Sequence, residues 1–159
     1  MKIARMTAAH AILFVLRGVP ALYYHSLLGS ENDLKGMETS GINRRINREK
    51  LPLVALETEL TTPGTLRYGV FSSLNKLLQL RQKHPAFSPL AAQKTLLLDD
   101  AFFGVERCSP DGNDTLTCVV NVSAGRQTLR LNVSGTCLLS GETFTGVCWQ
   151  VLWIQHSGD

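Results

Sequence analysis

The sequence has few of the features that indicate a metal site, a nucleic-acid-binding face or a membrane span. Only 18% of its residues are charged and its net charge is +3, which is too little for the broad basic stripe that nucleic-acid binding needs. Its apolar run from Ala8 to Leu16 is too short to cross a bilayer and is followed at once by Arg17, Gly18 and Pro20. No Cys-x-x-Cys pair occurs, and no histidine stands at zinc-ligand spacing. We therefore expect no nucleic-acid partner, no membrane span, no metal and no other cofactor.

The four cysteines bear on the compartment in which the protein works. An even number permits two disulfides, as in a secreted domain that such bonds stabilise. Buried free thiols are the commoner state in an intracellular enzyme, so we expect free cysteines and a cytoplasmic protein. All four lie in the C-terminal half of the chain, at Cys108, Cys118, Cys137 and Cys148.

The first half of the chain has helical patterns on either side of a long polar connection. Residues 2–16 are rich in Ala, Met, Ile and Leu at three- and four-residue spacing, which predicts a helix. Val19–Tyr24 is a short apolar run without alternation, typical of a strand covered on both faces, and so Tyr23 and Tyr24 are predicted to be core residues. Residues 25–62 form a long connection in which 50–60 favour a short helix.

A second long helix is predicted over residues 66–83, ended by His84 and Pro85. From about Gln93 the pattern changes to short runs of Val, Leu, Thr and Phe between turn clusters, which predicts an antiparallel all-β module. Trp149 and Trp153 share one face of a strand and are expected in its core. The strands are expected at residues 95–99, 102–107, 115–121, 126–131, 137–139 and 149–154.

Several segments together resemble the C-terminal part of the α-amylase superfamily, glycoside hydrolase family 13, in its sucrose phosphorylase and glucosylglycerate phosphorylase branch. They are Gly18-Val-Pro-Ala-Leu-Tyr-Tyr-His25, residues 25–34 with 44–51, residues 77–87, and residues 137–142 with 149–153. The resemblance implies an α+β fragment. The last helix-strand-helix portion of a (β/α)8 TIM barrel would occupy residues 1–90. An antiparallel β-sandwich, domain C, would occupy residues 91–159.

The resemblance also implies a retaining α-glucosyl-transferring phosphorylase, whose partners in the intact enzyme are a glucosyl donor sugar and phosphate. Retaining enzymes need two carboxyl groups about 5 Å apart. In this superfamily they stand on barrel strands that precede the part this chain resembles, so we expect no catalytic residue here and a chain that is inactive alone. The remaining carboxylates match none of the family's catalytic motifs, and examples are Glu31, Asp33, Glu38 and Glu49.

Four residues of the long connection are candidates for the substrate site. By resemblance, Arg44 is the loop arginine that contacts the glucosyl unit, and its planar fork of donors suits sugar hydroxyls or phosphate. His25 follows the C-terminal end of the expected strand. By resemblance it lies near where acceptor or phosphate would enter, and it is predicted to bind substrate. Asn47 and Arg48 are expected to hold the loop in shape. The alternative function is a β-sandwich module that binds carbohydrate or interacts with another polypeptide.

Overall fold

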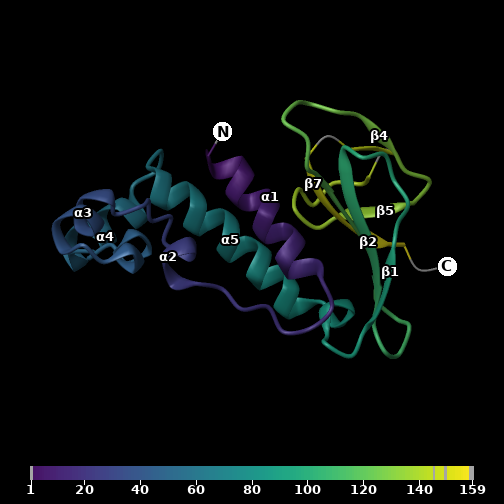
Figure 1. The fold of residues 1–159 in the computed structure, drawn as a ribbon. Helices are drawn as coiled ribbons and strands as arrows, with labels where there is room; N and C mark the ends of the chain where they lie inside the picture. The colour runs from purple at the N-terminus through teal and green to yellow at the C-terminus, as the bar shows by residue number, and fades with distance from the viewer. Residues whose placement is uncertain (1, 145, 149, 158–159) are drawn as a thin grey trace. The chain divides into compact units, whose positions relative to one another are not determined.

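The computed structural model describes residues 2–144, 146–148 and 150–157 and has the predicted α+β composition, with helices first and strands after (Figure 1). The helices are α1 (Lys2–Val15), α2 (Tyr24–Leu27), α3 (Leu34–Ser40), α4 (Leu53–Thr61) and α5 (Leu66–Lys83), with 3-10 turns η1 (Asn43–Asn47) and η2 (Pro85–Phe87). The strands are β1 (Ala92–Thr95), β2 (Phe102–Cys108), β3 (Thr115–Asn121), β4 (Leu129–Arg130), β5 (Gly135–Cys137), β6 (Val147–Cys148) and β7 (Val151–His156).

The chain divides into two compact units. One consists of residues 1–20 and 76–159 and is called the sheet unit below. The other consists of residues 21–75 and is called the loop unit. Helix α5 supplies residues to both units, and its observed bounds coincide with the predicted helix over residues 66–83.

The sheet unit is built on an antiparallel sheet of five strands in the order β1-β2-β3-β7-β5, beside a two-stranded pair of β4 and β6. The predicted antiparallel module is therefore confirmed. The central strand β3 is buried from Leu116 to Val120, so both of its faces are covered. On one face, Val119 packs with Leu129 and Leu131. On the other side, α1 contacts β2 and β3 and buries Phe14 (Figure 1).

Two arginines hold the C-terminal end of α1 in the sheet unit. Arg107 is fully buried, and its guanidinium donates to the carbonyl oxygens of Val15 at 2.7 Å, Ser88 at 2.8 Å and Ala92 at 3.2 Å. Arg81 donates to the carbonyl oxygens of Phe14 and Gly18. Because the last carbonyls of a helix lack partners within it and carry partial negative charge, guanidinium groups stabilise this end. Burial lowers the pKa of both arginines from the ordinary value.

Polar and aromatic contacts connect the segment after α5 to the sheet. The Asp114 carboxylate accepts the backbone N–H of Ala86 at 3.1 Å and lies 3.4 Å from Nδ1 of His84. The Phe87 ring packs against Trp153, with centroids 4.9 Å apart. The predicted core position of Trp153 is confirmed, since its side chain is fully buried. Trp149 lies outside the described residues.

The predicted strand over Val19–Tyr24 is wrong. Residues 19–23 have no regular structure and Tyr24 begins α2. Val19 is 84% exposed, Tyr23 45% and Tyr24 56%, so the prediction that both tyrosines are core residues is also wrong. A parallel strand needs a neighbour for its backbone N–H and C=O groups. Every strand pairing in the described part of the chain is antiparallel and excludes this segment.

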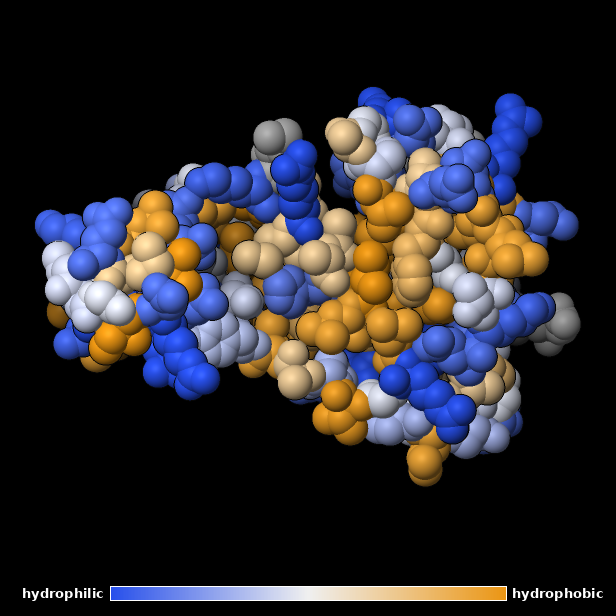
Figure 2. Space-filling view, in the orientation of Figure 1, coloured by the Kyte–Doolittle hydropathy of each residue, from blue (hydrophilic) through white to orange (hydrophobic). Residues whose placement is uncertain are grey.

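Apolar side chains reach the surface of the chain at several places (Figure 2). In α4 no residue is buried, and Leu53 and Val54 are 66% and 78% exposed. Soluble monomers rarely expose large contiguous apolar patches unless another surface covers them.

Candidate functional site

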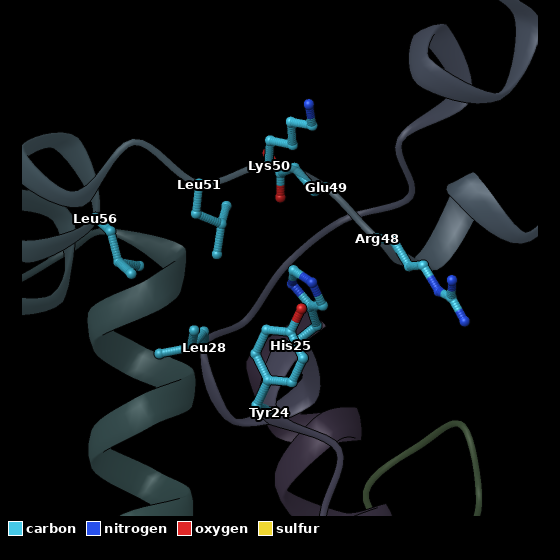
Figure 3. A pocket seen from close by; sticks show the side chains of 8 residues that line it. All are labelled: Tyr24, His25, Leu28, Arg48, Glu49, Lys50, Leu51 and Leu56. Atoms are coloured by element: carbon cyan, nitrogen blue, oxygen red, sulfur yellow. The ribbon is translucent and has the colours of Figure 1, made fainter. Parts of the chain in front are cut away.

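A hollow of about 490 Å³ lies within the loop unit (Figure 3). Its walls come from α2 and the turn after it, from the segment that follows η1, and from α4. The lining residues are Tyr24, His25, Leu28, Arg48, Glu49, Lys50, Leu51 and Leu56. The hollow therefore gathers apolar side chains, two cations, one carboxylate and one imidazole.

The turn after α2 is fixed by a glycine. Gly29 has φ +64°, a conformation that residues with a Cβ rarely adopt. A Cβ at this position would lie 3.2 Å from Cβ of Val70 and 3.3 Å from Cα of Arg67, so the turn packs closely on α5. The chain then returns, and the Ser30 N–H donates to the His25 carbonyl at 2.9 Å. This geometry places Ser30 beside the imidazole of His25.

Hydrogen bonds hold the segment around η1 in place. Asp33 caps α3 by accepting the Gly36 N–H at 2.8 Å, and its own N–H donates to the Ile46 carbonyl at 2.8 Å. The Tyr23 hydroxyl donates to the Asn47 carbonyl at 2.8 Å. These bonds tie η1 to the residues before α2 and to the start of α3.

Arg67, on α5, is the best-connected side chain of the loop unit, and the sequence analysis did not single it out. Its guanidinium lies 2.6 Å from the Glu59 carboxylate and 3.0 Å from that of Glu49. It also donates to the Leu28 carbonyl at 3.0 Å and to the Ser30 hydroxyl at 3.1 Å. The side chain is only 12% exposed. One arginine thus joins α5, α4, the turn after α2 and the segment lining the hollow.

His25 is the most enclosed polar residue of the hollow, with 5% of its surface exposed. Nδ1 lies 2.9 Å from the Ser30 hydroxyl oxygen, and the Tyr24 ring covers the imidazole, with centroids 4.1 Å apart. Nε2 is buried and has no hydrogen-bond partner. In Figure 3 the imidazole points toward the segment that carries Glu49 and Lys50.

The structure brings together some of the predicted site residues and not others. His25 and Arg48 both line the hollow. Arg44 is exposed on η1 and is not part of the lining, and Asn47 contributes its carbonyl oxygen to the Tyr23 bond. The roles assigned to all four stay predictions.

Two further findings concern the described residues alone. None of their helices is long and apolar enough to span a membrane. Within residues 2–144, 146–148 and 150–157, no three His, Cys, Asp or Glu side chains are grouped so that they could hold a metal ion. The Glu49 carboxylate pairs with Arg67 and that of Asp33 caps a helix, so both have structural partners.

Solved structures define the class of fold. AmyP in complex with maltose superposes on 99% of this chain with a TM-score of 0.75 and 16% identity, over 36% of its own length. The trehalulose synthase MutB from Pseudomonas mesoacidophila MX-45 superposes on 97% of this chain with a TM-score of 0.71 and 16% identity, over 38% of its length. At such low identity these likenesses concern the fold alone, which is that of part of a glycoside hydrolase family 13 enzyme.

Curated relatives identify the branch of the superfamily, although no family model matches the sequence. The chain is 38% identical over 156 residues to a glucosylglycerate phosphorylase of Allomeiothermus silvanus and 39% identical over 158 residues to one of Escherichia coli. These matches cover 97% and 96% of this chain but only 27% and 28% of the relatives, so the chain spans about a quarter of their length. A sucrose phosphorylase of Bifidobacterium adolescentis is 32% identical over 80 residues. The chain belongs to the α-amylase superfamily, in the branch that holds these phosphorylases.

Proposed function

We propose that the chain forms the C-terminal part of a retaining phosphorylase that transfers an α-glucosyl unit to phosphate. In this proposal residues 1–90 complete a (β/α)8 barrel and residues 91–159 form domain C. The main support is the extent of the sequence match. Two glucosylglycerate phosphorylases match nearly the whole chain, whereas the sucrose phosphorylases match about half of it. Glucosylglycerate is therefore favoured over sucrose as the donor, with inorganic phosphate as the second substrate.

The exposed segment before α2 supports the barrel assignment. Val19, Tyr23 and Tyr24 are apolar or aromatic and exposed, and residues 19–23 have no strand partner in the described part of the chain. Neighbouring barrel strands would supply the missing backbone partners and cover these side chains. Within such a barrel the segment around η1 would face the donor sugar, with Arg44 contacting the glucosyl unit and Asn47 and Arg48 keeping the loop in shape.

We expect the purified chain to form no glucose 1-phosphate from glucosylglycerate or sucrose with inorganic phosphate. The physical reason is that none of its carboxylates matches the acid and nucleophile that retaining transfer requires. Co-expression with the Escherichia coli relative, truncated where its match to this chain begins, is expected to restore turnover of glucosylglycerate. Glucose 1-phosphate release measures both results.

The truncated relative alone is the control for that assay and is expected to be inactive. In the complemented enzyme, Arg44→Lys is expected to lower kcat/KM about tenfold or more, because lysine keeps the charge and loses the fork of donors. Arg5→Lys, an exposed change on α1, serves as the matched substitution and should have no effect. Turnover by the purified chain alone would contradict the proposal that it lacks the catalytic groups.

We also propose a cytoplasmic location, supported by the state of the cysteines. Cys108, Cys118 and Cys137 are free thiols in the structure. Such thiols suit a reducing compartment. Cys118 is fully buried, and burial raises its pKa above the ordinary range of a thiol. A thiol of this kind is unreactive until the protein unfolds.

Titration with a thiol reagent is expected to count four thiols in the denatured chain. In the folded chain at about pH 8, half-buried Cys108 should react and Cys118 should stay unreacted, because only the thiolate is nucleophilic. Mass spectrometry after digestion identifies each labelled cysteine. Fewer than four thiols in the denatured chain would show a disulfide and would favour a secreted protein.

A further inference from the structure

The bonds around Ser30 determine which nitrogen of His25 carries the proton. A serine hydroxyl has one proton to donate and two lone pairs that accept. Arg67 is a donor only, so at the 3.1 Å contact the Ser30 oxygen must accept. The one proton of Ser30 is then available for Nδ1 of His25, which lies 2.9 Å away. A nitrogen that accepts a hydrogen bond in this way carries no hydrogen, and therefore Nε2 of neutral His25 carries it.

The opposite tautomer of His25, with the hydrogen on Nδ1, leaves more groups without hydrogen-bond partners. If Nδ1 donated to Ser30, the Ser30 proton would need a third acceptor, and the described contacts of this hydroxyl are only those with His25 and Arg67. The guanidinium also polarises the hydroxyl, which makes it a stronger donor toward His25. The chain Arg67–Ser30–His25 is in turn anchored by the two carboxylates of Glu49 and Glu59 on Arg67.

The remaining donor of His25 has no partner within the protein. Nε2 is buried without a hydrogen bond, which is costly and therefore rare in native structures. The cations that line the hollow are suited to an anion. Arg48 and Lys50 line the same hollow, and the one lining carboxylate, that of Glu49, is already paired with Arg67 at 3.0 Å.

We propose that Arg67, acting through Ser30, holds His25 in the tautomer with its proton on Nε2, so that the hollow, which Arg48 and Lys50 also line, binds an oxyanion through a preset neutral donor. Arg67 and Ser30 are positioning residues, whereas His25 contacts the ligand. The oxyanion is a phosphate or a carboxylate. The choice of inorganic phosphate and glycerate as its sources rests on the proposed function, whereas the tautomer of His25 does not.

The tautomer is measured by long-range proton–nitrogen NMR on the full chain labelled with ¹⁵N-histidine at about pH 8. We expect a protonated Nε2 and an unprotonated Nδ1 for His25, assigned by the loss of its signals in His25→Asn. Ser30→Ala is expected to abolish this preference, and Ser30→Thr, which keeps the hydroxyl, to retain it. Unchanged signals of His84 and His156 show that the sheet unit is still folded in each variant.

The ligand is tested by titrating the same sample with inorganic phosphate, with glycerate and with glucose as the neutral comparison. Phosphate or glycerate should shift the Nε2 signals, the tighter of the two identifying the source, and glucose should not. Ser30→Ala is expected to weaken that binding about twofold, because a His25 without tautomer preference carries its proton on Nε2 only about half of the time. A protonated Nδ1 in the unmodified chain, an unchanged tautomer in Ser30→Ala, or equal shifts with glucose would overturn the proposal. If complementation fails while the tautomer and the oxyanion shifts appear, only the proposed enzymatic function is lost.

Discussion

Replacing Arg107 by methionine is expected to lower the free energy of unfolding by about 3–4 kcal/mol. Methionine keeps an unbranched apolar stem but lacks the guanidinium and donates no hydrogen bond. The change would leave the carbonyl oxygens of Val15, Ser88 and Ala92 without the donor that they share in a buried position. Each buried acceptor left unsatisfied costs about 1–3 kcal/mol, partly offset because no charge is buried any longer. Since domains are stable by only about 5–15 kcal/mol, this is a large part of the total.

Urea unfolding followed by circular dichroism measures this effect, with an unchanged slope showing that the two-state approximation holds. Arg130→Met on β4 is the matched control, because Arg130 is exposed, and it should change stability by less than about 0.5 kcal/mol. Arg107→Lys is expected to fall between the two, because its ammonium keeps the charge but cannot reach three carbonyls in one plane. Equal stability of Arg107→Met and Arg130→Met would show that Arg107 does not hold the end of α1.

The helices and the long strands follow from local pattern. The predicted helix over residues 2–16 is observed as α1 (Lys2–Val15), and the one over 66–83 is observed without change, because periodic apolar residues and Pro85 define it locally. The strand predicted over residues 115–121 is also observed unchanged, as β3. The strand predicted over 126–131 shrinks to Leu129–Arg130, since a two-residue pairing depends on its partner β6.

The strand predicted over Val19–Tyr24 is not observed for the same reason, because it has no pairing partner. Its apolar composition suits a strand, but a strand forms only where a neighbour pairs its backbone, and composition does not show whether that neighbour is present. His25 was identified as a site residue from its place at the end of this run. The structure places it in the hollow by a different route, through α2 and the turn at Gly29.

Arg67 could not be identified from the sequence. On a helix pattern a charged residue indicates a solvated face, and its partners lie 8, 18, 37 and 39 positions away. No periodicity connects residues so far apart. The same holds for Arg107, which stands in the buried strand β2 beside apolar residues and whose partner Val15 is 92 positions away. Buried arginines that bind carbonyls become visible only when the fold is known.

Replacing Trp153 by alanine is expected to lower the free energy of unfolding by about 3–5 kcal/mol. The side chain is the largest fully buried one of the sheet unit, pairs in register with Cys118 and packs on Phe87, so alanine leaves a large cavity under β7. Trp153→Phe separates packing from hydrogen bonding. Because the indole N–H has no partner, phenylalanine loses no bond and should cost only about 1.5 kcal/mol.

Leu97→Ala is the matched control for the loss of a large apolar side chain, since Leu97 is fully exposed and its removal should change stability by less than about 0.5 kcal/mol. Urea unfolding followed by circular dichroism compares the three variants without depending on tryptophan fluorescence. Equal losses for Trp153→Phe and Trp153→Ala would mean that the indole N–H has a partner and that hydrogen bonding, not volume, holds Trp153 in place. The expected order instead makes the contact between Trp153 and Phe87 the link between the segment after α5 and the sheet. Arg81, whose guanidinium lies 5.7 Å from the Phe87 ring centroid, extends that link to the end of α1.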